Sequence, residues 1–226
     1  MGLYTDGRIR MLAYAYAAEL GLALALTAVF FANRAAGLLA WDIVPGIQVL
    51  VAGFGAWLNY RLTGRKIWAA AALFLVYMAF SETFEFHRII GLVLLHWHNG
   101  PLDLISTYFP CLLIHRHPQT IPIVATSVLW LMLIPGLFKQ VQNSLPGFIT
   151  FCLSLIIMAA VIGEYLLLCK YGKLGALRFG PAWGIRQVAE LFGTFSLGLS
   201  FAFVAKANKD KLQSRRPDDH NLTPET

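Results

Sequence analysis

Long apolar runs, separated by short polar segments, dominate the chain up to residue 206. A helix that crosses a membrane needs about 20 mostly apolar residues. Measured against that length, the pattern predicts seven spanning helices, at residues 11–33, 40–60, 67–97, 102–115, 119–138, 147–170 and 183–205. We therefore expect an all-α, polytopic integral membrane protein that forms a single bundle of seven transmembrane helices.

The run at residues 102–115 is short for a full crossing. If it is re-entrant or lies in the interface, the protein has six spans. Residues 89–95 are apolar all round, whereas an interfacial helix is amphipathic, and this favours seven spans. Basic residues do not fix the orientation, because seven spans divide them ten against eight and six spans divide them eleven against seven.

Composition supports the same class of protein. Hydrophobic residues make up 58% of the chain and charged residues 13%, whereas soluble domains carry about 25% charged residues. We expect residues 1–206 to form the bundle and residues 207–226 to form a disordered polar tail. The first apolar run is too long for a cleavable signal peptide and has no small-residue cleavage site.

The net charge of +6 comes from basic residues in the loops and the tail, as membrane orientation requires. We therefore expect no nucleic-acid partner. The expected partners are the lipid bilayer and a hydrophobic small-molecule substrate, and the sequence leaves the oligomeric state open. Cys111, Cys152 and Cys169 lie in or beside apolar runs and are expected to behave as small buried apolar residues.

The stretch from Ser81 to Arg88 places four ionisable groups inside otherwise apolar sequence. An ionisable group at the centre of a membrane costs about 2.5–3.5 kcal/mol on insertion scales. In a continuous helix, Glu82 and Glu85 share a face because they are three residues apart. Arg88 can pair with Glu85, whereas His87 points to a different face. Four such groups need partners, water or a function.

Three further helices carry a carboxylate within their apolar spans. Glu19 lies near the centre of the first helix, Glu164 in the last third of the sixth, and Glu190 near the start of the seventh. Residues of this kind usually face the bundle interior or a wet cavity, so we expect an internal polar chamber. The candidate catalytic residues are Glu82, Glu85, Glu190, Glu19, His87 and Glu164.

Structural roles compete with catalysis for some of these residues. Arg186 lies one turn before Glu190 and can neutralise it, and Arg88 can neutralise Glu85. Glu164 is close enough to its helix end to reach the interface. Glu82 and Glu19 have no basic partner within their helices. Because low-dielectric surroundings favour the protonated carboxyl group, such residues could act as general acids.

The histidines form two His-x-His pairs, His96 with His98 and His115 with His117. Residues two apart on a helix point about 200° from each other, so neither pair chelates a metal from a regular helix. Only a re-entrant segment could bring both pairs together with Asp103. No zinc, haem or di-iron spacing is present, so we expect no metal and no other cofactor.

One fragment resembles a known family. Arg116-His117-Pro118-Gln119, followed by Glu164 and then by Lys170-Tyr171-Gly172, is similar to the cofactor-facing signature of the isoprenylcysteine and phospholipid methyltransferases. The resemblance implies that S-adenosylmethionine binds near Arg116 and Glu164. Thr120, Pro122 and Gly163 depart from that pattern, and a further helix follows where the family usually ends.

The carboxylates favour an intramembrane enzyme that acts on a prenyl, terpenoid or lipid substrate. A protonated Glu would supply the acid for cyclisation, isomerisation or transfer, and a second carboxylate the base. Three alternatives stay open. They are a proton-coupled transporter or channel with the carboxylates as a relay, a membrane methyltransferase that uses S-adenosylmethionine, and a non-catalytic subunit of a membrane complex.

Overall fold

The computed structural model describes residues 34–84, 120–170 and 181–214 continuously, together with scattered positions between Tyr14 and Val93. Side chains are described over residues 43–84 except Glu82, over residues 125–163, and over residues 185–214 except Gln187. The described positions from Tyr14 to Val29 are helical, within the first predicted span.

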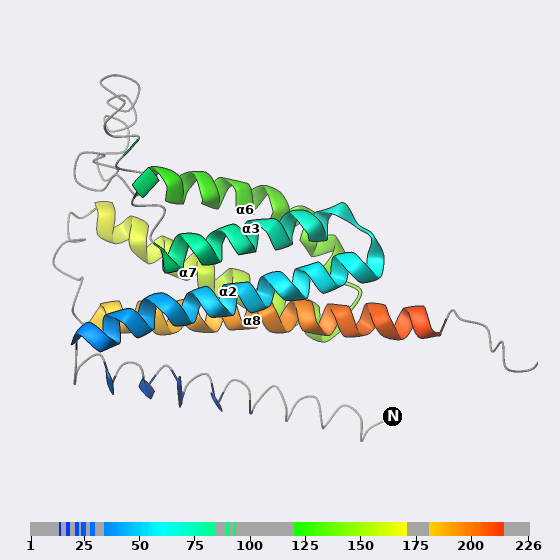
Figure 1. Ribbon diagram of the computed structural model, residues 1–226, viewed down its shortest axis with the longest axis horizontal. Coiled ribbons are helices and arrows are strands. Elements are labelled where there is room, and N and C mark those ends of the chain that lie inside the picture. Colours follow the sequence, from blue (N-terminus) through cyan, green and yellow to red (C-terminus); the bar gives the residue numbers. More distant parts are fainter. Residues whose placement is uncertain are drawn as a thin grey trace, which may run out of the picture.

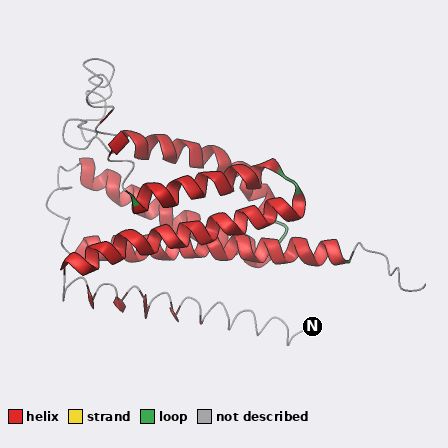
Figure 2. Ribbon diagram, viewed as in Figure 1, coloured by secondary structure: helices red, strands yellow, loops and turns green. Residues whose placement is uncertain are grey.

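Helices make up almost all of the described chain, and this part of the chain contains no strand (Figure 2). The continuous helices are α2 (Arg34–Thr63), α3 (Lys66–Thr83), α6 (Thr120–Val141), α7 (Leu145–Lys170) and α8 (Pro181–Gln213). The all-α prediction is therefore confirmed for the described residues.

Two short connections join helices at the same end of the bundle. Gly64 ends α2 with a φ of 68°, a left-handed conformation that glycine adopts at little cost, and its N–H donates to the carbonyl of Tyr60 over 2.7 Å. Residues 142–144 join α6 to α7, where the N–H of Ser144 donates to the carbonyl of Val141 over 3.0 Å. Both connections keep neighbouring helices antiparallel.

Contacts between side chains establish the direction of each helix. Gly46 packs on Thr83 and Gly53 on Leu75, so α2 and α3 are antiparallel. The rings of Phe74 and Trp130 stack 5.4 Å apart, and the side chain of Ile67 lies against Gly136, so α3 and α6 are also antiparallel. Figure 1 shows the same alternation.

The long helix α8 lies against two neighbours. Gln48 contacts Thr194 and Asn59 contacts Phe201, so α8 runs parallel to α2. Ser154 hydrogen-bonds to the carbonyl of Gly193 at one level and Ser200 to that of Gly147 at another, so α8 is antiparallel to α7. Thus α2, α6 and α8 run in one direction, while α3 and α7 run in the other (Figure 1).

Small and polar residues fill much of the interior. Five serines, a threonine and Asn59 are buried among the described residues, as are several alanines of α2 and α3. The largest fully buried side chains include Trp68 and Phe201, whose rings meet edge to face with centroids 5.1 Å apart. Interfaces between membrane helices are enriched in small residues and in hydroxyls that hydrogen-bond across helices, and this interior has that composition.

The outer surface is apolar. Leu73 is 74% exposed, Met132 72% and Ile156 66%. In water such a surface would drive association, whereas lipid chains solvate it. Within the described part of the chain, three helical segments are long and apolar enough to cross a membrane: Ile43–Thr63, Leu145–Gly163 and Val188–Gln213. Two shorter apolar helices, Lys66–Ser81 and Ala125–Val141, pack beside them. These features indicate a membrane protein.

The seven-helix bundle is not confirmed. Seven spans would make the helix at 67–97 parallel to the helix at 119–138, because one full crossing would separate them. The contacts make α3 and α6 antiparallel instead, so Thr83 and Thr120 lie at the same end of the bundle (Figure 1). This arrangement matches the alternative of six spans.

Two predicted boundaries differ from the observed ones. The helix predicted at 67–97 ends at Thr83, because Phe84 leaves helical geometry with φ −107° and ψ 8° while its N–H still bonds to the carbonyl of Phe80. The last helix continues to Gln213, although residues 207–213 were predicted to belong to a disordered tail. Apolar character ends near Lys206, but the backbone hydrogen bonds of α8 continue into polar sequence.

Candidate functional site

Four of the five carboxylates in the described helices lie at one end of the bundle, which we call the acidic end, whereas Asp210 lies at the other end. Glu82 lies in the last turn of α3, Glu164 in the C-terminal part of α7, and Glu190 in the N-terminal part of α8. Asp42 lies near the start of α2. All four lie at the end that holds Thr83 and Thr120, away from the two short connections (Figure 1).

Glu82 occupies a different depth from the one its sequence position predicts. In a helix over 67–97 it would lie near the centre, whereas α3 ends one residue after it. The C-terminal end of a helix carries a partial negative charge, which disfavours an ionised carboxylate there by roughly 0.3–1 kcal/mol. The last turn of α3 is therefore an unfavourable position for an ionised carboxylate.

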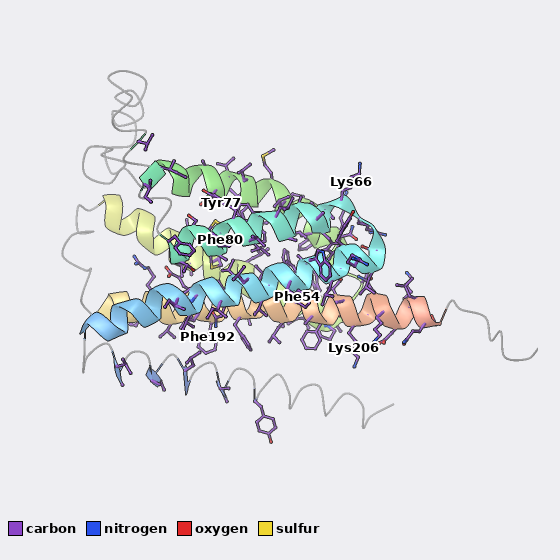
Figure 3. All side chains as sticks on the ribbon, viewed as in Figure 1. Phe54, Lys66, Tyr77, Phe80, Phe192 and Lys206 are labelled. Atoms are coloured by element: carbon purple, nitrogen blue, oxygen red, sulfur yellow. The ribbon has the colours of Figure 1, made fainter. Side chains whose placement is uncertain are left out.

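An apolar groove lies beside this helix end, between α2 and α3. Its volume is about 260 Å³. The residues that line it recur at helical spacing on both walls. They are Ile43, Gly46, Ile47 and Leu50 of α2, Ala79, Phe80 and Thr83 of α3, and Phe84, which follows α3. Ile47 and Phe84 are more than half exposed. The groove therefore opens on the outer, apolar surface of the bundle, where Figure 3 labels Phe80.

Glycine at position 46 brings the two walls together. A Cβ atom there would collide with Oγ1 of Thr83 and lie 3.4 Å from the carbonyl oxygen of Ala79. The close approach sets the groove floor and places Thr83 on it, one residue after Glu82. Two carboxylates, Glu82 and Glu85, are sequence neighbours of the last two groove-lining residues, and Glu82 is the one whose backbone the structure describes.

A second polar cluster lies between α2 and α8. The Nε atom of Arg186 lies 3.3 Å from Oε1 of Glu190, and the two side chains are 23% and 31% exposed. That nitrogen is shielded from solvent but does not meet hydrogen-bond geometry, so the contact is mainly electrostatic. One turn later, Oγ1 of Thr194 lies 2.8 Å from Oε1 of Gln48 and 2.9 Å from the carbonyl oxygen of Glu190.

Helix α2 separates the two features. Gly46 faces α3 and Gln48 faces α8, and both belong to the same turn of α2. The groove beside Glu82 and the cluster around Glu190 therefore lie on different sides of this helix. Glu190 is paired with Arg186, as the sequence allowed. The side chain of Glu82 lies outside the described ones, so the predicted shared chamber stays a prediction.

The remaining candidates lie partly or wholly outside the described residues. The backbone of Glu164 is part of α7, but its side chain is not described. Glu19, Glu85 and His87 lie outside the described residues, as do all four histidines of the His-x-His pairs. Among the side chains that the structure describes, no group of three or more His, Cys, Asp and Glu residues could hold a metal ion.

Sequence reasoning missed the uncharged residues that build these contacts. Gln48 and Thr194 are polar positions inside apolar helices, which is the signal that could have drawn attention to them. Gly46 and Thr83 carry no such signal, because their importance depends on which helix faces them. The role of a residue at a helix–helix contact depends on which helix packs against it, and a single sequence does not reveal that neighbour.

Comparisons with known proteins add no relative. No protein-family model, no curated protein and no solved structure matches this chain. The methyltransferase signature at Arg116-His117-Pro118 lies outside the described residues and remains a prediction from the sequence.

Proposed function

We propose that this protein is a membrane enzyme that acts on a lipophilic substrate, with Glu82 as its general acid. The observation that carries the proposal is the apolar groove between α2 and α3, which is open toward lipid and ends at the helix terminus that bears Glu82. A prenyl, terpenoid or acyl chain could enter this groove sideways from the bilayer without crossing a polar surface.

The proposed chemistry follows from the position of Glu82. The negative end of α3 favours the protonated carboxyl group, and a group that holds its proton can deliver it to a double bond or a leaving group of the substrate. Apolar walls would exclude water from the cation that forms, and the ring of Phe80 or Phe84 could stabilise it by a cation–π contact. Proton-initiated cyclisation, isomerisation or transfer are the reaction classes that fit.

The proposal includes a multi-pass topology with six spans. The antiparallel pairing of α3 and α6 supports it, since the segment between them leaves and returns at the acidic end. The spans would then be the helix predicted at 11–33 together with α2, α3, α6, α7 and α8. In this arrangement both termini lie on the side opposite the acidic end.

Lipid analysis tests the enzymatic proposal. The full chain would be expressed in a host that lacks it, and the lipid and prenyl products would be profiled by mass spectrometry. We expect a product that depends on the wild-type protein, disappears with Glu82→Gln and returns at least in part with Glu82→Asp, which keeps the acid. A product unchanged by Glu82→Gln in folded protein would refute the role of Glu82.

A pair of matched variants tests the groove. Ile47→Trp fills it, whereas Val51→Trp places the same bulk on the same helix at a 61% exposed position that does not line it. We expect the first variant to abolish the product and the second to retain it. Equal activity of the two variants would mean that the substrate does not use the groove.

The contact cluster between α2 and α8 supports a second function, a proton-coupled transporter. Glu190, Thr194 and Gln48 place polar groups inside the bundle at neighbouring levels, as a relay of protons requires. Proton flux into liposomes, measured with an enclosed pH-sensitive dye, distinguishes the two. Flux that is lost in Glu190→Gln but retained in Glu82→Gln would favour the transporter.

A further inference from the structure

Positive charge gathers at the end of the bundle opposite Glu82 and Glu190, which we call the basic end. Among the residues that the structure describes, seven exposed basic residues lie there against one acidic residue, Asp210. They come from the α2–α3 connection, the last turn of α6 and the last turns of α8, and are Arg61, Arg65, Lys66, Lys139, Lys206, Lys209 and Lys211. Figure 3 labels Lys66 and Lys206 at this end.

Contacts with neighbouring groups hold part of this surface in place. A guanidinium N–H of Arg65 donates to the side-chain oxygen of Gln140, which ties the α2–α3 connection to α6. The guanidinium carbon of Arg61 lies 5.5 Å from the centre of the Trp57 ring. Tryptophan is enriched at membrane–water interfaces, so this pair marks the level of the headgroups.

Helix dipoles do not account for all of the basic residues at this end of the bundle. Arg61, Lys139 and Lys211 lie in the last turns of α2, α6 and α8, where a cation is favourable. Lys66 lies at the first residue of α3, where a cation is unfavourable. Helix dipoles therefore explain some of the cations at this end but not Lys66.

We propose that the basic end is a contact surface for the anionic phospholipid headgroups of the cytoplasmic leaflet. Basic residues concentrate on the cytoplasmic side of membrane proteins, and each Lys or Arg near an anionic surface strengthens the attraction. Among the described residues, seven basic residues lie at this end and three at the other, Arg34, Lys170 and Arg186; over the whole chain, the six-span division is eleven against seven in the same sense. Ser214, which follows α8, would then be cytoplasmic.

The proposal does not depend on the enzymatic function, but it constrains it. The acidic end would lie at the opposite leaflet, so the groove beside Glu82 would receive its occupant from that side. A substrate confined to the cytoplasmic leaflet would have to change leaflets before reaching Glu82.

The first experiment determines which side the basic end faces. Asn143, in the exposed α6–α7 connection, would be replaced by cysteine in a background where Cys111, Cys152 and Cys169 are serine. A membrane-impermeant maleimide should label this residue only after the cells are permeabilised. A fluorescent protein fused after Thr226 requires no cysteine replacement and should fluoresce, since it folds in the cytoplasm. Labelling of intact cells, or a dark fusion, would overturn the proposal.

The second experiment measures lipid binding by the purified full chain. Phosphatidylglycerol and phosphatidylcholine would be titrated into detergent-solubilised protein, with the unfolding midpoint as the readout. We expect phosphatidylglycerol to bind more tightly than phosphatidylcholine. The ratio of the two affinities should fall by about 100-fold when Arg61, Arg65 and Lys66 are all replaced by Gln, which corresponds to about fivefold for each charge removed. Salt at 1 M, where the Debye length is about 3 Å, should have a similar effect.

Matched variants keep the result interpretable. Gln142→Ala with Asn143→Ala changes two exposed uncharged residues at the same end and should leave the preference unchanged. If the triple variant fails to fold, replacement of Lys206, Lys209 and Lys211 by Gln provides the same test on α8. The proposal would be overturned if the wild-type chain bound the two lipids equally. It would also be overturned if a folded triple variant kept the wild-type lipid preference.

Discussion

The contact between Gly46 and Thr83 predicts that adding a single methyl group will separate α2 from α3. A Cβ atom at position 46 would approach Oγ1 of Thr83 more closely than the 3.0 Å that real Cβ atoms respect, and it would lie 3.4 Å from the carbonyl oxygen of Ala79. The hydroxyl belongs to a short β-branched side chain with little freedom to move aside. Gly46→Ala should therefore force a shift at the groove floor.

The magnitude follows from two opposing effects. Overpacking of a tight interior typically costs about 1–3 kcal/mol, whereas replacing a helical glycine by alanine gains about 1 kcal/mol of helix propensity. Gly163→Ala is the matched control, because nothing lies within 4 Å of its added Cβ. Both glycines lie inside helices, so the propensity effect cancels, and Gly46→Ala should be less stable than Gly163→Ala by about 1–3 kcal/mol.

Unfolding in mixed micelles provides the assay, with far-ultraviolet circular dichroism followed against the mole fraction of sodium dodecyl sulfate. Thr83→Ala removes the colliding hydroxyl, so the double variant Gly46→Ala/Thr83→Ala should recover most of the lost stability. Thr83→Ser keeps the hydroxyl and should restore less. If Gly46→Ala is as stable as Gly163→Ala, or if Thr83→Ala gives no rescue, the packing argument is refuted.

Two further predictions concern polar contacts of α8. Asn59 is fully buried, and its side-chain N–H donates to the carbonyl of Phe201 over 2.9 Å. Its side-chain oxygen accepts from Nδ2 of Asn208 over 2.9 Å. A double-mutant cycle of Asn59→Ala and Asn208→Ala, measured by the same unfolding assay, should give a coupling free energy of about 0.6 kcal/mol. Strictly additive effects would contradict the observed hydrogen bond. Arg186 and Glu190 form a partly exposed pair. A cycle of Arg186→Gln and Glu190→Gln should therefore give a coupling free energy of only about 0.2–1 kcal/mol. A coupling of several kcal/mol would show that the pair is a buried structural element.

Two apolar runs predicted the bounds of a helix to within a few residues. The predicted helix at 147–170 corresponds to α7, Leu145–Lys170, and the one at 119–138 to α6, Thr120–Val141. The prediction failed at 67–97, where apolar sequence on both sides of Glu82 suggested one continuous helix, although α3 ends at Thr83. Hydropathy indicates whether a segment can lie in lipid, but it does not reveal where the backbone leaves helical geometry.

The candidate site was predictable only in part. The pairing of Glu190 with Arg186 follows from their spacing on one helix, and the structure has it. The shared chamber was inferred from depth alone and stays a prediction, because the side chain of Glu82 is not described. Helix α2 lies between the groove and the cluster around Glu190. Which side of α2 faces α3 and which faces α8 is a property of the assembled bundle.

The sequence by itself determined the helical class, the apolar exterior and the presence of costly carboxylates, because each of these follows from the transfer of side chains between water and lipid. Only the tertiary structure decided the directions of the helices, since direction depends on which residues of α3 and α6 meet. It also brought four of the five described carboxylates to one end and seven of the ten described basic residues to the other. Glu82 thereby changed from a residue expected at mid-membrane to one at a helix end beside an apolar groove, because depth is set by where α3 stops and by what packs against it.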